Sequence, residues 1–146
     1  MEKTFILVAF LFFACSEKSE KNEQVQEIKF SSPSEVVMSF VKAMNAQDSL
    51  GIENVLSNKS KQSIIPKIHE AGGFRKMFEA MKGMQMDVMI IGVDSASNPA
   101  KIFTNQKIVK DTTIFMKLDS LHFSAVREDG GWKLISLNAR PNSMSP

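Results

Sequence analysis

The sequence predicts an α+β fold in which N-terminal helices pack on one face of a curved antiparallel sheet of four strands. Two observations carry this prediction. Apolar residues recur at helical spacing between residues 33 and 83, and from residue 84 onward the apolar period falls to two while β-branched and aromatic residues become frequent. Helices that precede the strands, rather than alternating with them, are typical of α+β domains, and a curved sheet covered by helices forms a cone.

The first helix has a complete start signal. Ser32 is placed as the N-cap, Pro33 occupies the first helical position, and Glu35 follows the cap by three residues, which is the pattern of a capping box. An apolar stripe at helical spacing then runs to about Asn45. This stripe consists of Val36, Val37, Phe40, Val41 and Met44.

Shorter helices are predicted between residues 48 and 83. Asp48 can cap a helix that ends at residues 57–58. Pro66 has no amide hydrogen and restricts the residue before it, so we expect the next helix to start at this proline. Two glycines at 72–73 break that segment, and a last helix ends at Gly83. The apolar positions are Ile52, Val55 and Leu56 in the first of these helices and Phe74, Met77, Phe78 and Met81 in the last.

Four strands are predicted after Gly83. They span residues 84–93, 100–109, 112–127 and 132–137. The alternation of the third strand slips near Asp119-Ser120, which predicts a bulge, because a straight strand would turn one apolar set out to water. The sequence Glu128-Asp-Gly-Gly131 predicts a hairpin turn, since Asp-Gly and Gly-Gly supply the positive φ that tight turns need.

The N-terminal segment predicts export and lipidation. The apolar run from Phe5 to Ala14 would form a helix of roughly 15 Å, about half of a hydrocarbon core, and is typical of a signal peptide. Leu11-Phe-Phe-Ala-Cys15 resembles the lipobox of bacterial lipoproteins. That resemblance implies removal of residues 1–14 and acylation of Cys15 with fatty chains such as palmitate. A buried cysteine in an N-terminal helix is the alternative, and it is disfavoured because the run has no polar face.

The remaining chain divides into a tether, one domain and a tail. Residues 15–30 begin with the lipidated cysteine and continue as a mixed-charge stretch that is typical of a disordered tether. The folded domain is predicted to span 31–138, followed by a loose tail at 139–146. The formal net charge is only +2 and the lysines alternate with glutamates, so we predict no nucleic-acid partner.

Three segments resemble a known superfold. They are Ser32-Pro-Ser-Glu-Val-Val-Met-Ser-Phe-Val-Lys-Ala-Met-Asn45, Ala71-Gly-Gly-Phe74 and Val126-Arg-Glu-Asp-Gly-Gly-Trp-Lys-Leu-Ile135. Over most of residues 31–137 the chain resembles the nuclear-transport-factor-2-like, cystatin-like superfold, and within it the bacterial lipoprotein domains of unknown function. The resemblance implies a cystatin-like cone. It leaves the function open, because this fold carries enzymes, binding modules and adaptors.

The residue types argue against most enzymes. The chain has no tyrosine, no Gly-x-Ser-x-Gly motif and no glycine-rich phosphate loop, and its two histidines lie in no metal-ligand spacing. We therefore predict no catalytic residue, no metal and no cofactor. One alternative stays open. If the strand face that carries His122 lines the cone, His122 could be the general base of a lyase or isomerase, with Asp119 or Asp87 as its partner; if that face is turned to solvent, it is a surface residue.

Methionines are concentrated near the predicted junction of helix and sheet. Their side chains are flexible, so they favour a plastic apolar pocket, although ordinary core packing explains them too and a Cu(I) site is a third interpretation. The predicted ligand-binding residues are Met77, Met81, Met84, Phe40 and His122.

These observations together predict a binding or interaction domain without enzymatic activity, held at a membrane of the bacterial cell envelope by its anchor at Cys15. The outer membrane is favoured, with the domain in the periplasm or at the cell surface. The expected partners are the membrane and an apolar small molecule. A third hypothesis is a structural protein that forms a homodimer through the outer face of the sheet.

Overall fold

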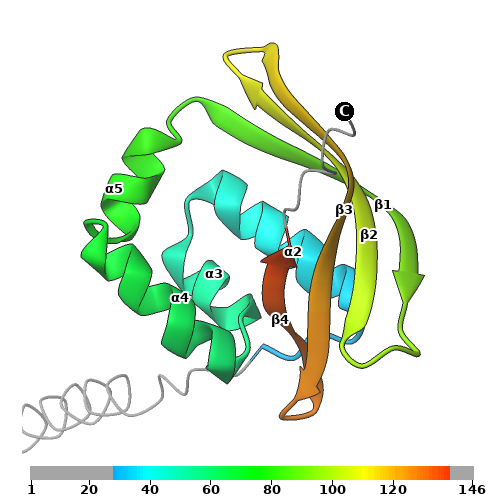
Figure 1. Cartoon of the computed structure of the whole chain (residues 1–146). Coiled ribbons are helices and arrows are strands. Elements are labelled where there is room, and N and C mark those ends of the chain that lie inside the picture. The colour runs from blue at the N-terminus through cyan, green and yellow to red at the C-terminus, as the bar shows by residue number, and fades with distance from the viewer. Residues whose placement is uncertain (1–27, 139–146) are drawn as a thin grey trace, which may run out of the picture.

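The structure is a computed structural model that describes residues 28–138. Helices precede strands, so the predicted α+β order is confirmed (Figure 1). The predicted signal segment, Cys15, most of the tether and the tail lie outside the described residues. The elements are α2 (Pro33–Ala46), α3 (Ser49–Val55), α4 (Asn58–Glu70), α5 (Gly73–Ala80), β1 (Met84–Asp94), β2 (Ala100–Lys110), β3 (Thr113–Glu128) and β4 (Gly131–Asn138).

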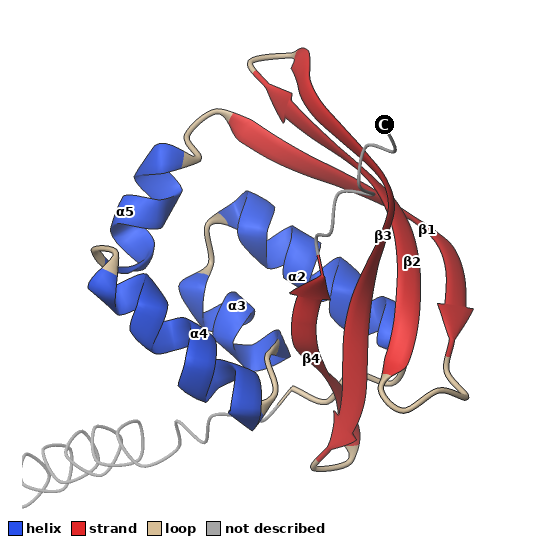
Figure 2. Ribbon diagram, viewed as in Figure 1, coloured by secondary structure: helices blue, strands red, loops and turns tan. Residues whose placement is uncertain are grey.

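The strands form one antiparallel sheet in the order β1-β2-β3-β4. The sheet curves, and helices α2, α3, α4 and α5 lie on the same side of it (Figures 1 and 2). Helix α2 packs directly against the sheet, whereas α4 and α5 form a helical hairpin that stands farther from the strands. This is the predicted cone.

The core lies between α2 and the inner face of the sheet. Four of the five residues of the apolar stripe of α2 are buried as predicted, and Met44 is half-buried against the core. Phe40, which is 4% exposed, packs edge-on against Phe123 of β3 with ring centroids 6.0 Å apart. The strands contribute buried side chains at alternate positions, which are Ile102, Phe123, Ala125 and Leu134.

The start of α2 differs from the predicted capping box in one detail. The Ser32 hydroxyl accepts a hydrogen bond from the Glu35 N–H at 3.1 Å, as expected of the N-cap. The Glu35 carboxylate, however, accepts hydrogen bonds from the backbone N–H and the hydroxyl of Ser31, both at 2.6 Å. The Glu35 carboxylate of this capping box therefore bonds to Ser31, the residue before the N-cap.

The carboxylate of Glu35 makes stability depend on acid pH. Hydrogen bonds from the Ser31 hydroxyl and then from the Ser31 backbone lower the pKa of Glu35 from its ordinary value of 4.5. A lowered folded-state pKa means that the stabilisation is complete above pH 4.5 and is lost as the pH falls through the folded pKa. We expect Glu35→Gln to be less stable than the wild type near pH 6, and this difference to narrow near pH 3.

Urea unfolding at both pH values measures this difference. The control is Glu79→Gln, because the Glu79 side chain is exposed and makes no hydrogen bond within residues 28–138. A difference for Glu35→Gln that is the same at both pH values would show that the Ser31 contacts do not stabilise the charged form.

Helix α4 corrects one prediction. It begins at Asn58 and contains Pro66, whereas a start at the proline was expected. Ser57 is the N-cap, accepting from the Ser60 N–H at 3.2 Å, and the Asn58 N–H donates to the Glu128 carboxylate at 3.0 Å. These contacts with the cap and with β3 hold the first turn of the helix, so the backbone hydrogen bond that is missing at the exposed Pro66 is tolerated.

Two predicted irregularities of the sheet are confirmed. Ser120 has a positive φ of 58°, the register between β2 and β3 shifts beside it, and its N–H donates to the Asn105 side chain at 3.1 Å. At the β3–β4 turn, Asp129 and Gly130 have φ of 53° and 80°. These two positive values define the tight hairpin turn that the Asp-Gly sequence predicted.

Candidate functional site

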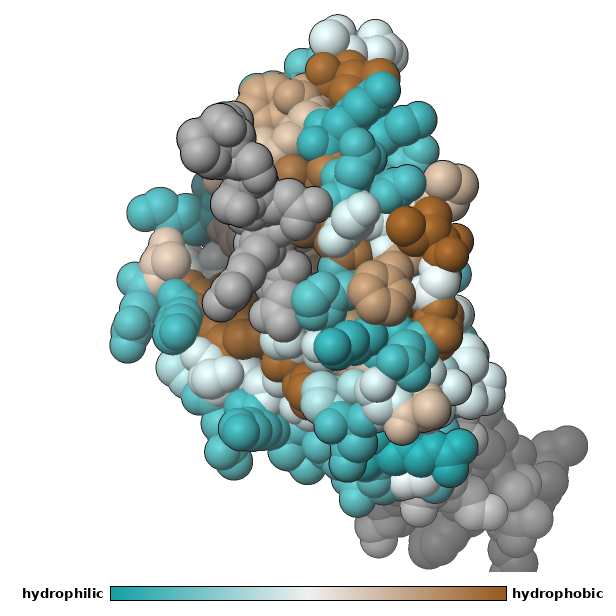
Figure 3. Space-filling model, turned by 45° about the vertical axis from the view of Figure 1, so that its right-hand side comes forward, coloured by the Kyte–Doolittle hydropathy of each residue, from teal (hydrophilic) through white to brown (hydrophobic). Residues whose placement is uncertain are grey.

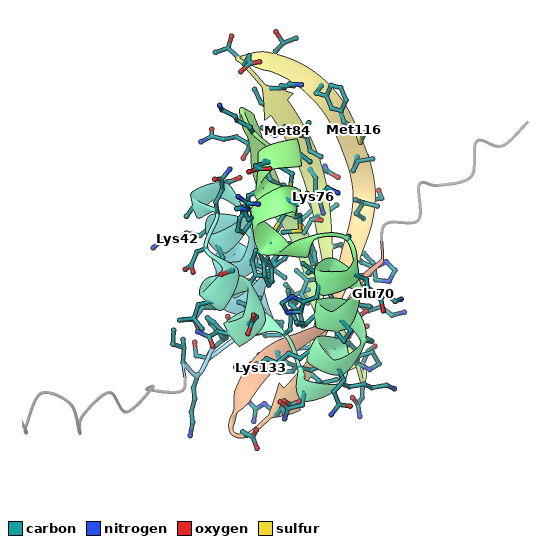
Figure 4. The ribbon with its side chains drawn as sticks, turned by 90° about the vertical axis from the view of Figure 1, so that its left-hand side faces the viewer. Lys42, Glu70, Lys76, Met84, Met116 and Lys133 are labelled. Carbon is teal, nitrogen blue, oxygen red and sulfur yellow. The ribbon has the colours of Figure 1, made fainter. Side chains whose placement is uncertain are left out.

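The groove between α4 and α5 is the candidate site. It has a volume of about 430 Å³, within the range of roughly 300–1,000 Å³ that is typical of small-molecule sites. Figure 4 looks onto this helical side of the molecule, with Lys76 on α5 and Glu70 at the end of α4. The lining residues are Ile64, Lys67, Ile68 and Ala71 from the first wall and Gly73, Lys76, Met77 and Ala80 from the second.

Matching apolar stripes form the two walls. On α4 the stripe is Ile64, Ile68 and Ala71, and on α5 it is Gly73, Met77 and Ala80; both have the spacing i, i+4, i+7 of one helical face. Ile64 and Met77 are half-buried and pack against the core, so they connect the groove to the rigid part of the domain.

The turn at 72–73 brings these walls together. Gly72 and Gly73 have φ of 107° and 83°, a region of backbone conformation that glycine enters at little cost. Beyond α5, the backbone N–H of Met84 donates to the Met81 carbonyl at 2.9 Å, which closes the loop into β1. The groove is thus the inside of a short helical hairpin.

The structure does not bring the predicted site residues together. Met77 lines the groove, while Met81 and Met84 lie half-buried at the junction of α5 and β1. Phe40 is a core residue. His122 lies on the outer face of the sheet, where its ring packs against that of Phe103 with centroids 6.0 Å apart. Its neighbours on β3 are buried toward the helices, so His122 does not line the cone.

Most of the groove-lining residues were not predicted from the sequence. Because a helix start was predicted at Pro66, Ile64 and Ile68 were assigned to different segments, and the apolar stripe of α4 was not recognised. The signal that was present is the repeat of i, i+4, i+7 on both sides of the paired glycines, which indicates two helical faces folded against each other.

Two other hollows are more polar. One, of about 540 Å³, lies between α2 and β1 and includes Lys42, Asn45 and Asp87 among its lining residues. The Asn45 amide donates to the Met86 carbonyl and accepts from the Met86 N–H, both at 2.8 Å, so this amide is held by the backbone of β1. The other, of about 480 Å³, lies on the outer sheet face; its charged side chains are Asp87, Lys107, Lys117 and Asp119.

The outer sheet face also carries exposed apolar side chains. Met89 is 60% exposed and Phe103 is 37% exposed. With the sheet side turned forward, hydrophobic and hydrophilic residues are mixed over the surface (Figure 3).

Residues 28–138 contain no group of three or more His, Cys, Asp or Glu side chains that could hold a metal ion. Within the same residues, no helix is both long and apolar enough to cross a membrane.

The comparisons with known proteins bear on the fold alone. No protein-family model matches the chain, and no curated protein matches it significantly. The chain is similar to a crystal structure from Thiobacillus denitrificans that is described as a candidate calcium/calmodulin-dependent protein kinase type II association domain, with 15% sequence identity and a TM-score of 0.58. The match covers 74% of this chain and 93% of the other. The α+β cone is therefore a nuclear-transport-factor-2-like fold, as the sequence resemblance implied.

Proposed function

We propose that this domain binds an apolar small molecule in the groove between α4 and α5. The observation that carries the proposal is the composition of the groove: six of its eight lining residues are apolar or glycine. Among them, Met77 can adapt its flexible side chain to an irregular guest. Concave, mostly apolar sites of this volume are typical of small-molecule binding.

Binding without catalysis is the role that the site favours. The rival hypothesis, a lyase or isomerase in the cone, needs His122 and a carboxylate to converge in a pocket. His122 instead contacts Phe103 on the outer face, and the hollow that holds Asp87 and Asp119 does not include it among its lining residues. This separation supports the binding hypothesis.

A membrane anchor at Cys15 belongs to the same proposal. The lipobox resemblance of residues 11–15 supports acylation there, in the bacterial cell envelope, with the outer membrane favoured. Several acyl chains anchor a protein stably. A domain tethered beside lipid would meet apolar molecules at high local concentration, which is where a groove of this kind would be useful.

Native mass spectrometry of the full-length protein, released from a neutral maltoside micelle in the presence of dodecanol, tests the proposal. We expect one bound dodecanol. Ala80→Trp places a large ring in the groove and should reduce occupancy by about tenfold, which corresponds to about 1.4 kcal/mol. The same mass spectra report whether the chain is a monomer or the homodimer that the outer sheet face could form.

The matched control is Glu79→Trp. Glu79 is the neighbouring exposed residue on α5 and does not line the groove, so this variant should bind dodecanol like the wild type. Absent binding, or an equal loss in both variants, would overturn the groove as the site. A dimer without bound dodecanol would favour the structural-partner hypothesis instead.

A further inference from the structure

Two lysines line the groove, one on each of its helical walls. Lys67 stands five residues before Gly72 on α4, and Lys76 stands four residues after it on α5. Because the helices are joined at this glycine turn, both lysines lie about one helical turn from the closed end of the hairpin. A Cβ at position 72 would lie 2.5 Å from the Cδ atom of Lys76, so the aliphatic stem of this lysine runs along the turn.

The two ammonium groups are not balanced by acidic groups in the groove. Within residues 28–138, Lys67 and Lys76 are the only charged residues that line it. Neither lysine forms an ion pair with any residue in the range 28–138, and both are exposed. Such a pair of cations is complementary to one anionic group that reaches both.

The helical hairpin as a whole is positively charged. Residues 58–83 contain six Lys or Arg and two Asp or Glu, a net charge of +4, whereas the whole chain has a net charge of only +2. The helical hairpin therefore carries a larger net positive charge than the chain as a whole, which attracts anions toward this part of the molecule.

The size of the groove favours a ligand with a single chain. Its length is set by α5, whose eight residues span about 12 Å. The volume of about 430 Å³ is near the lower end of the range for small-molecule sites. The apolar stems of both lysines extend the apolar walls toward the rim while their charged ends stay in water.

We infer that the ligand of the groove is an anionic amphiphile with one chain, namely a free fatty acid whose carboxylate contacts Lys67 and Lys76 while its alkyl chain lies between Ile68 and Met77. This inference rests on the proposed function and specifies its ligand class. The carboxylate would bridge the two helices, and the chain would replace water along both apolar stripes.

A competition experiment tests the charged end separately from the chain. The full-length protein is offered dodecanoate and dodecanol at equal concentration near pH 7.5, and the bound species are counted by native mass spectrometry. We expect dodecanoate to be preferred by about five- to tenfold, because two ion pairs at an exposed rim each contribute a modest amount. The preference should fall as salt is raised.

The double variant Lys67→Gln with Lys76→Gln should abolish the preference for dodecanoate over dodecanol. Its control is Lys61→Gln with Lys82→Gln, which removes the same charge from the same hairpin outside the groove lining. Equal binding of dodecanoate and dodecanol to the wild type would overturn the fatty-acid assignment but would still support an apolar binding site in the groove. If neither probe binds, both the fatty-acid assignment and the proposed binding function are wrong. Displacement of dodecanoate by phosphatidylglycerol at lower concentration would identify a membrane lipid as the occupant and overturn the inference.

Discussion

Phe40→Ala is expected to lower the free energy of unfolding by about 3–5 kcal/mol. Phe40 is 4% exposed and contacts Phe123 edge-on, so its removal leaves a cavity between α2 and the centre of the sheet and also breaks an aromatic pair. Stability of single domains is typically about 5–15 kcal/mol, so this one change would remove a large part of it.

Urea unfolding followed by circular dichroism measures the loss. Met38→Ala is the control on the same helix, because Met38 is 44% exposed and its truncation should change stability by about 0.5 kcal/mol or less. If Phe40→Ala does not fold, Phe40→Leu should fold with a loss of about 1–2 kcal/mol. Similar losses of unfolding free energy for Phe40→Ala and Met38→Ala would mean that Phe40 is not a central residue of the core.

Ser60→Ala has the second largest expected effect, a loss of about 1–3 kcal/mol. The Ser60 hydroxyl donates to the Ile135 carbonyl of β4 at 2.8 Å and accepts from the Ser57 hydroxyl at 2.9 Å. Ser57 and Ser60 are both buried. Alanine would therefore remove the donor to the Ile135 carbonyl and the acceptor for the Ser57 hydroxyl in a largely buried site.

The control for this variant is Ser63→Ala, one turn along α4. Ser63 is exposed and its hydroxyl donates only to the Ser60 carbonyl within the helix, so a change of about 0.5 kcal/mol or less is expected. Urea unfolding again measures the difference. Equal effects at positions 60 and 63 would contradict a role for Ser60 in fixing α4, and with it one wall of the groove, to the sheet.

The features that were predicted correctly depend on neighbours in sequence. Ser32, Pro33 and Glu35 are within one helical turn of each other. The hairpin turn at Asp129-Gly130 and the bulge at Ser120 were likewise predicted from residues adjacent in sequence. The start of α4 depends in part on a contact that the local sequence does not contain. Asn58 is capped by Glu128, which is 70 residues away, so no window around Pro66 could reveal it.

The candidate site was harder to predict because it depends on which helix faces meet. The methionines of α5 indicated an apolar face, and Met77 does line the groove. The partner stripe on α4 and the two lysines become one site only when the hairpin folds at Gly72. The alternation along β3 correctly placed His122 on the opposite sheet face from Leu121 and Phe123. It could not show which of the two faces is turned toward the helices.

The hydrogen bonds of Asn45 have a consequence for how this protein avoids self-association. β1 is an edge strand, and a bare edge is a template on which another chain can add a strand. By donating to and accepting from the backbone of Met86, the Asn45 amide fills one such pairing position with a side chain of α2. An intruding strand would have to displace a helix of the core to pair there, so the first half of β1 is protected against aggregation by the same helix that builds the fold.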